Sequence, residues 1–276
     1  MADQLDGATL EDTACFRCHH PGRLEFTASP YGIRRCPNCD IVFVSPRLDL
    51  DARSALYQEP GYFEGRVYTG DGHDGDNGMA TFLQHRWAAG RLAILDRHHG
   101  STTAGTDGDR GRMLEVGCAY GLFAARAIEH GWAVSAMDVS EAAVARTRLR
   151  LEIEVHRGLV GDVPLAADSF DVVVAWDVIE HVSDPAEFLD HVRRVLVPGG
   201  TIALSLPDAS SWPARWLRHR WWTLRPDEHI WHFTPDTLTT TLHDAGFTDV
   251  MVTTHPLAPA NLGRLDSMVA TATLAP

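Results

Sequence analysis

The sequence LEVGCAYG, residues 114–121, joins an apolar run to a short stretch of small residues. This pattern is typical of a buried strand that ends in a tight turn before a helix. Glycines at such a turn let a ligand approach the backbone, and the N-terminus of the following helix favours anionic groups. The spacing Gly117-x-Ala119-x-Gly121 differs from the GxGxxG pattern of dinucleotide-binding turns. The stretch therefore predicts either a ligand-binding turn or a purely structural one.

Strand-length apolar runs and helical stretches alternate after this turn. The expected strands are residues 113–118, 133–139, 152–157, 171–176 and 201–206, and the expected helices are residues 122–130, 141–151 and 185–197. This alternation predicts an α/β, doubly wound fold with a parallel sheet covered by helices on both faces. A helix at 235–245 should then precede strands at 249–254 and 267–274. Because no helix separates these two strands, we expect them to pair antiparallel.

Acidic residues follow several of the expected strands. Asp138 ends the second strand, about 20 residues after the turn, where a carboxylate can accept hydrogen bonds from both hydroxyls of a ribose. Asp162 follows the third strand, and Trp176-Asp177 ends the fourth. As an ordered set over residues 112–276, these motifs closely resemble the class I S-adenosylmethionine-dependent methyltransferases. The expected antiparallel last strand also matches the seven-stranded, Rossmann-like sheet of that family.

The resemblance implies S-adenosylmethionine as cofactor. The residues that it implies for cofactor binding are Glu115, Gly117, Ala119, Tyr120, Gly121, Asp138, Val139, Asp162, Val163, Trp176 and Asp177. The turn would surround the methionine part, Asp138 would hold the ribose, and Asp162 with the Val163 backbone would face the adenine. Ala119 replaces the family's middle glycine. The family's acidic residue directly after Gly158 is missing, so Asp162 is either the adenine contact or a solvated loop carboxylate.

Four of the five cysteines form two pairs near the N-terminus, Cys15-x2-Cys18 and Cys36-x2-Cys39. Two such knuckles suit a tetrahedral Zn²⁺ site, and a site closed by four thiolates would be structural rather than catalytic. The alternatives are disulfide pairing, which a reducing cytoplasm disfavours, and a metal-free ribbon. His19 and His20 beside Cys18 are less favoured ligands.

The N-terminal stretch resembles the zinc ribbon that precedes some bacterial methyltransferases of natural-product and surface-polysaccharide pathways. The resemblance rests on CFRCHH, RRCPNCDIVFVSPR and LYQEPGYFEG, and it extends to DEHIWHFTPDTLTTTLHDAGF at Asp227–Phe247. It implies a zinc ribbon at 1–50, a helical connector and cap at 51–111, and a methyltransferase domain at 112–276 with an aromatic lid near 208–233.

The segment between Pro207 and Thr234 is unusually aromatic. It contains five of the eight tryptophans, which are Trp212, Trp216, Trp221, Trp222 and Trp231, interleaved with Arg215, Arg218, Arg220 and Arg225. After the fifth strand, such a segment could form a substrate wall that excludes water, or a hydrophobic cluster that packs the ribbon onto the core. Its arginines could bind an anionic substrate or a nucleic acid, or could simply be solvated.

Histidines supply the candidate general bases, since methyl transfer to a hydroxyl or an acidic carbon also removes a proton. The candidates are His229, His232 and His181, and His229 leads because it follows the aromatic segment. A structural role in the loop after strand four is the preferred interpretation for His181.

Composition narrows the possible functions. The 276 residues include no lysine, which excludes Schiff-base chemistry and a P-loop lysine. Their net charge of −13 makes a nucleic-acid partner unlikely. No apolar run approaches the roughly 20 residues of a membrane span, and the N-terminus lacks signal-peptide features, so we expect a cytoplasmic protein. The sequence predicts a methyltransferase acting on a small molecule in a bacterial biosynthetic pathway. An RNA methyltransferase and a non-catalytic binding protein are the alternatives, and the methylated atom and the oligomeric state are left open.

Overall fold

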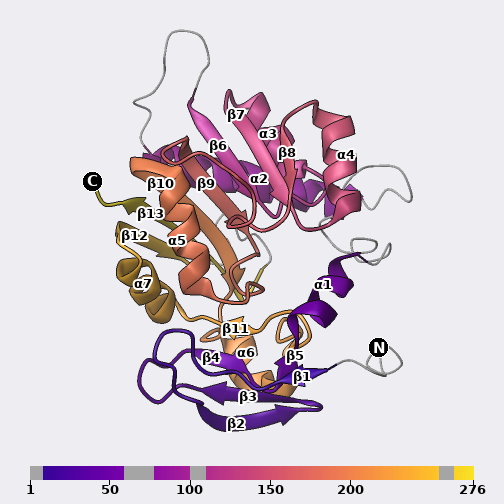
Figure 1. Ribbon diagram of the computed structural model, residues 1–276, viewed down its shortest axis with the longest axis vertical. Helices are drawn as coiled ribbons and strands as arrows, with labels where there is room; N and C mark the ends of the chain where they lie inside the picture. Colours follow the sequence, from indigo (N-terminus) through magenta and orange to yellow (C-terminus); the bar gives the residue numbers. More distant parts are fainter. Residues whose placement is uncertain (1–8, 59–77, 100–109, 255–263) are drawn as a thin grey trace.

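The computed structural model describes residues 9–58, 78–99, 110–254 and 264–276. Its centre is a seven-stranded sheet with the order β12-β13-β10-β9-β6-β7-β8 (Figure 1). The strands are β6 (Arg112–Val116), β7 (Ala133–Asp138), β8 (Val155–Arg157), β9 (Phe170–Trp176), β10 (Leu196–Pro207), β12 (Phe247–Thr253) and β13 (Ser267–Leu274). Strand β13 pairs antiparallel with both β10 and β12, and all other neighbouring strands in this sheet pair parallel. The predicted Rossmann-like sheet with an antiparallel last strand is confirmed.

Helices cover both faces of this sheet, as predicted. On one face lie α2 (Gly78–His99), α3 (Leu122–Glu129) and α4 (Glu141–Leu151); on the other lie α5 (Pro185–Val195) and α7 (Pro235–Asp244). Local signals fix where these helices begin. Ser140 caps α4, Asp184 caps α5 before Pro185, and Thr234 forms a capping box with Thr237 at the start of α7.

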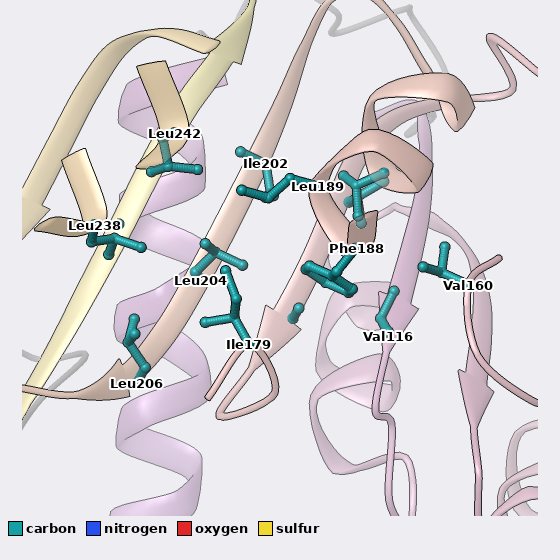
Figure 2. Packing of buried hydrophobic residues seen from close by; sticks show 14 of the residues in the cluster. Val116, Val160, Ile179, Phe188, Leu189, Ile202, Leu204, Leu206, Leu238 and Leu242 are labelled. Carbon is teal, nitrogen blue, oxygen red and sulfur yellow. The ribbon is translucent and has the colours of Figure 1, made fainter. Parts of the chain in front are cut away.

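Alternation along β9 divides the core into two layers. Val172 and Val174 pack with α2 and α3, whereas Val173 and Ala175 pack with α5 and α7. Figure 2 shows the second layer, where Phe188 and Leu189 of α5 and Leu238 and Leu242 of α7 meet β10. Because α2 buries Leu92 and Leu95 against the sheet, this part of the connector forms one of its covering layers.

Several elements differ in length from their predictions, and β10 differs most, because it runs from Leu196 to Pro207 instead of over 201–206. Strand β8 begins at Val155 instead of residue 152, because Glu152 adopts a left-handed conformation that ends α4. Helix α5 ends at Val195, because Leu196 is extended and already pairs with Phe170 of β9. The Gly- and Asp-rich stretches at 69–78 and 100–111 lie almost wholly outside the described residues.

The N-terminal module is a second, smaller sheet. Its order is β11-β4-β3-β2, with β2 (Arg23–Ala28), β3 (Tyr31–Arg35), β4 (Val42–Val44) and β11 (Trp231–His232), while β1 (Leu10–Glu11) pairs separately with β5 (Arg47–Leu48). Strand β11 comes from the aromatic segment about 190 residues further along the chain, so the module is completed by a strand that the sequence pattern did not predict. A short helix, α1 (Leu50–Gln58), leads from the module towards the large sheet (Figure 1). None of the described helices is long and apolar enough to cross a bilayer.

Candidate active site

The turn after β6 has the backbone that its glycines predict. Gly117 and Gly121 have φ angles of +73° and +72°, and Ala119 between them is also left-handed, at +46°. A Cβ atom on Gly117 would lie 2.6 Å from Cγ2 of Val178, so glycine is required there by conformation and by space. On Gly121, a Cβ atom would lie 2.8 Å from Cγ2 of Thr147. The turn is therefore packed against two neighbouring elements and is held in one shape.

Asp138 fixes this turn from the end of β7. Its Oδ2 accepts a hydrogen bond from the Ala119 N–H at 2.8 Å, and its Oδ1 accepts one from the Ser140 N–H at 2.9 Å. Burial raises the pKa of Asp138, although these backbone donors oppose that shift. The next residue, Val139, accepts a hydrogen bond at its carbonyl from Nε2 of Gln58 at 3.0 Å. The last residue of α1 therefore reaches the carboxyl edge of the large sheet.

Glu115 lies beneath the turn in the middle of the sheet and is 3% exposed. Burial raises its pKa to about 8, with the Arg91 charge acting in the opposite direction. Its Oε2 is buried and has no hydrogen-bond partner among the described residues. An unsatisfied polar atom of this kind is costly and marks a place where a bound polar group would be favourable.

The other predicted cofactor residues are dispersed around this edge. Tyr120 is half-buried under the Arg146 guanidinium, whose carbon lies 4.4 Å from the ring centroid. Asp162 is exposed, and the Val163 N–H donates within its own turn to the Leu159 carbonyl at 3.2 Å. Trp176 is buried edge-on against Phe123, at 5.0 Å between ring centroids. The structure thus gathers the glycine turn, Asp138 and Glu115 most closely.

Asp177, also predicted to adjoin the cofactor, is held by two arginines. Arg264 donates to both carboxylate oxygens, at 2.8 and 3.2 Å, and Arg91 lies 3.4 Å from Oδ2. The Arg91 guanidinium also stacks over the Trp176 ring at 4.6 Å. Neither arginine carries a sequence signal, because both lie 86 or more residues from Asp177 and come from different elements.

The predicted bases His181 and His229 lie together at the same edge, with a third residue that sequence reasoning missed. Their rings meet edge to face, with centroids 4.7 Å apart. One ligand atom each from Glu180, His181 and His229 lies within 4.8 Å of the others, an arrangement that could also hold a metal ion. Both Glu180 oxygens are buried without a hydrogen-bond partner among the described residues. Burial, and to a lesser extent the nearby Asp177 charge, raises the pKa of Glu180 well above the usual range.

Hydrogen bonds orient both histidines. Nδ1 of His229 lies 2.6 Å from the Thr223 carbonyl oxygen, and because a carbonyl only accepts, Nδ1 carries the proton. Burial lowers the pKa of His229 to about 3, so the ring is neutral near pH 7 and Nε2 presents its lone pair. His181 is half-buried, has a pKa lowered to about 4 by burial, and bonds through Nδ1 to the Tyr57 hydroxyl at 3.1 Å.

His232, the remaining predicted base, lies apart from this cluster. It belongs to β11, pairs with Val42 of β4, and faces the Trp221 ring at 5.9 Å. Burial lowers its pKa to about 3, and its Nε2 has no hydrogen-bond partner in the described part of the chain. Its position faces the ribbon rather than Glu180 and the other two histidines.

The four paired cysteines converge in the N-terminal module. The Sγ atoms of Cys15, Cys18, Cys36 and Cys39 all lie within 4.8 Å of one another, and all four thiols are free. Both cysteine loops contain the same backbone hydrogen bond, in which the carbonyl of the first cysteine accepts from the N–H of the residue four positions later. The His19 N–H donates to Cys15 at 2.8 Å, and the Asp40 N–H donates to Cys36 at 3.0 Å. These residues form a four-thiol cluster of the kind that binds a tetrahedral metal.

The aromatic segment joins the ribbon to the sheet domain. Trp221 and Leu224 pack with Ile33 and Val44 of the ribbon, and Trp231 meets Phe16 edge-on at 5.0 Å. Trp221 therefore packs within the ribbon's own hydrophobic cluster, whereas Trp231 belongs to the large core, together with Phe16 of the ribbon. Trp212, Trp216 and Trp222, by contrast, are more than half exposed.

The fold and this site define a Rossmann-like domain with a glycine turn and a buried carboxylate, Asp138, at its carboxyl edge, beside the cluster of Glu180, His181 and His229. A family described as a methyltransferase domain matches residues 79–252, which is well over half of the chain. The chain belongs to this methyltransferase family.

Named relatives agree with the family. The chain is 36% identical over 140 residues to a probable S-adenosylmethionine-dependent methyltransferase of Mycobacterium tuberculosis, a match that covers 50% of this chain and 49% of the relative. It is 35% identical over 139 residues to a ubiquinone biosynthesis O-methyltransferase of Caulobacter, covering 42% of this chain and 55% of that protein. The chain thus spans about half the length of these curated relatives.

Solved structures agree in fold. Phosphoethanolamine N-methyltransferase 2 of Haemonchus contortus, in complex with S-adenosyl-L-methionine, superposes with a TM-score of 0.56 at 15% identity. The match covers 85% of this chain and 63% of that one.

Proposed function

We propose that this protein transfers a methyl group from S-adenosylmethionine to a small-molecule acceptor in a bacterial biosynthetic pathway, in the cytoplasm. The observation that carries the proposal is the position of the histidine cluster. Consecutive residues of α1 connect the two halves of the site: Tyr57 bonds to His181, and Gln58 bonds to the Val139 carbonyl beside Asp138. The acid–base groups therefore lie at the same sheet edge as the glycine turn, which supports a shared site.

Residues at this edge fit the cofactor. The left-handed glycine turn leaves backbone exposed for close approach, Asp138 has a second lone pair on each oxygen for ribose hydroxyls, and the unpartnered Glu115 Oε2 lies beneath the turn. When bound, S-adenosylmethionine supplies an electrophilic methyl group on a sulfonium. Asp162, Val163, Trp176 and Asp177 complete the proposed cofactor residues, with Tyr120 and Val139 beside them.

His229 is the proposed general base. Its Nδ1–H is held by the Thr223 carbonyl, so Nε2 is directed as a proton acceptor for a hydroxyl or an acidic carbon. Glu180 and His181 adjoin it, and Tyr57 orients His181. His229 is 5% exposed and Glu180 is 1% exposed, so the acceptor must enter an enclosed site. Such burial favours a small compound over RNA, which the net charge of −13 also repels.

Zinc in the cysteine cluster is the second part of the proposal. Zn–S bonds of about 2.3 Å in a tetrahedron place the sulfur atoms about 3.8 Å apart. The observed cluster, in which the Sγ atoms of Cys15 and Cys39 are 3.4 Å apart, is compatible with that geometry. Four thiolates leave no open position on the metal, so its role would be to hold the ribbon against the sheet domain.

The experiment that tests the proposal uses S-adenosylmethionine labelled on its methyl group. The purified protein is incubated with two fractions of a bacterial extract, total RNA and deproteinised small molecules, and cofactor binding is measured separately by calorimetry. We expect label in the small-molecule fraction. Label in RNA alone would replace the small-molecule acceptor with RNA, and failure to bind both S-adenosylmethionine and S-adenosylhomocysteine would refute the methyltransferase activity.

A further inference from the structure

A cavity lies on the ribbon side of the molecule, and its lining includes neither the proposed cofactor residues nor Glu180, His181 and His229. Its volume is about 220 Å³, and it lies between the strands β2 to β4 and the short helices α6 (Trp212–Leu217) and η3 (Arg218–Arg220). Apolar side chains form much of its lining, among them Phe26, Ile33 and Trp221. The cavity is smaller than the roughly 300 to 1,000 Å³ of sites that enclose a whole drug-sized ligand, so it suits one end of a molecule.

Three arginines give this cavity a positive charge. Arg35 is paired with Glu25 at 2.6 Å, while Arg218 lies over the Phe26 ring at 5.2 Å and donates to the Glu25 carbonyl at 3.3 Å. The Arg215 guanidinium has no ion pair or hydrogen bond to another described residue. Among the lining residues, one carboxylate stands against three guanidinium groups, which gives the lining an excess of two positive charges. In a chain with a net charge of −13, this local excess is opposite to the overall field.

A buried polar atom at the same cavity also lacks a partner. His232 contributes to the lining and is 3% exposed, and its Nε2 makes no hydrogen bond to any described residue. A buried ring nitrogen left unsatisfied is unfavourable unless a ligand or water supplies the missing bond. The cavity therefore combines an excess of two positive charges with an unsatisfied hydrogen-bonding group on an apolar wall.

We propose that this cavity binds the phosphorylated end of a small organic molecule. The planar guanidinium group matches phosphate oxygens with paired hydrogen bonds, and the two excess positive charges balance the charge of about −2 on a phosphate monoester at neutral pH. A carboxylate would balance only one of them. The apolar wall of Phe26 and Trp221 receives the organic part, so free inorganic phosphate is not the preferred ligand.

The cavity shares a wall with the methyl-transfer site. The turn that carries Trp221 and Leu224 also presents the Thr223 carbonyl, which holds His229. Ligand binding at this cavity is measured directly and without S-adenosylmethionine, so its result does not depend on whether the protein transfers methyl groups.

Calorimetry on the full chain tests the inference, with uridine 5′-diphosphate and ribose 5-phosphate as probes and uridine and inorganic phosphate as controls. We expect at least one phosphorylated probe to bind, and uridine to bind at least tenfold more weakly. Binding of both phosphorylated probes identifies the sugar phosphate as sufficient, whereas binding of uridine 5′-diphosphate alone identifies a nucleotide.

Variants connect the binding to the cavity. Arg215→Gln and Arg218→Gln should each weaken binding by about tenfold or more, because each removes a charge-assisted hydrogen bond. Arg193→Gln is the matched control, since Arg193 is an exposed arginine on α5, away from the cavity, and should leave binding unchanged. Both cavity arginines are exposed, so neither substitution removes a core residue.

Three outcomes would overturn the inference. These are the absence of binding by both phosphorylated probes, binding of inorganic phosphate alone, and binding that Arg215→Gln and Arg218→Gln leave unchanged. Retained calorimetric binding of S-adenosylhomocysteine by each variant shows that the fold is intact in the same sample.

Discussion

Replacing Gly117 with alanine should both destabilise the protein and weaken cofactor binding. The left-handed backbone at φ +73° costs a non-glycine residue about 1–2 kcal/mol. The added methyl group would also lie 2.6 Å from Cγ2 of Val178, and forcing an extra carbon into a packed site costs about 1–3 kcal/mol. We therefore expect Gly117→Ala to lower the free energy of unfolding by about 2–5 kcal/mol, measured by urea denaturation.

The chain offers a control that separates these two costs. Gly199 has a nearly identical φ of +77°, but a Cβ atom there would meet nothing within 4 Å. Gly199→Ala should therefore show only the backbone cost of about 1–2 kcal/mol. Adding Val178→Ala to Gly117→Ala should remove most of the steric cost, so the double variant should be more stable than the sum of the single effects predicts.

Cofactor affinity gives a second measurement on the same variants. Val178 lies two residues before Glu180, so a displaced Val178 disturbs both the turn and the acid–base cluster. Calorimetry should show weakened S-adenosylhomocysteine binding for Gly117→Ala and normal binding for Gly199→Ala. The reasoning is refuted if the two alanine variants lose equal stability, or if Val178→Ala has the same effect with and without Gly117→Ala.

Three further outcomes follow from the site. His229→Gln should reduce methyl transfer by about 100-fold or more while cofactor binding persists, with the exposed His219→Gln as control; a comparable rate in both variants would exclude His229 as the base. The pKa of Glu115 is about 8 in the folded state, above its ordinary value of 4.5, so between these pH values the folded state binds a proton that the unfolded state has lost. The free energy of unfolding should therefore fall as pH rises from about 5 to 8. Denaturation measured across this range should show a shallower fall for Glu115→Gln. Cys15→Ser and Cys39→Ser should each release zinc and lower stability, and unchanged zinc content by elemental analysis would contradict the four-thiol assignment.

Local patterns predicted the large sheet well, because each of its strands and helices carries its own signals. The glycines at 117 and 121 and Asp138 sit at strand ends that the sequence marks clearly, and the caps Ser140 and Asp184 start their helices as the residues suggest. A strand's length is less visible, since the left-handed Glu152 that shortens β8 depends on how α4 ends.

Long-range partners explain most of what the sequence did not predict. Tyr57 lies 124 residues from His181, and Arg264 lies 87 residues from Asp177, so no spacing rule connects them. Glu180 stands beside His181 in the sequence, and an acidic residue next to a candidate base was the available signal. His232 was grouped with the bases by its proximity to His229, but the pairing of β11 with β4 turns it towards the ribbon.

Strand β11 limits how this protein can be recombined. Its two residues complete the N-terminal sheet, and they follow His229 by only two and three positions. An exchange of residues 1–50 between homologous enzymes would therefore install a ribbon whose fourth strand still belongs to the recipient. We expect working chimeras to carry residues 9–48 and 227–234 from the same parent, so that these two distant segments are inherited together.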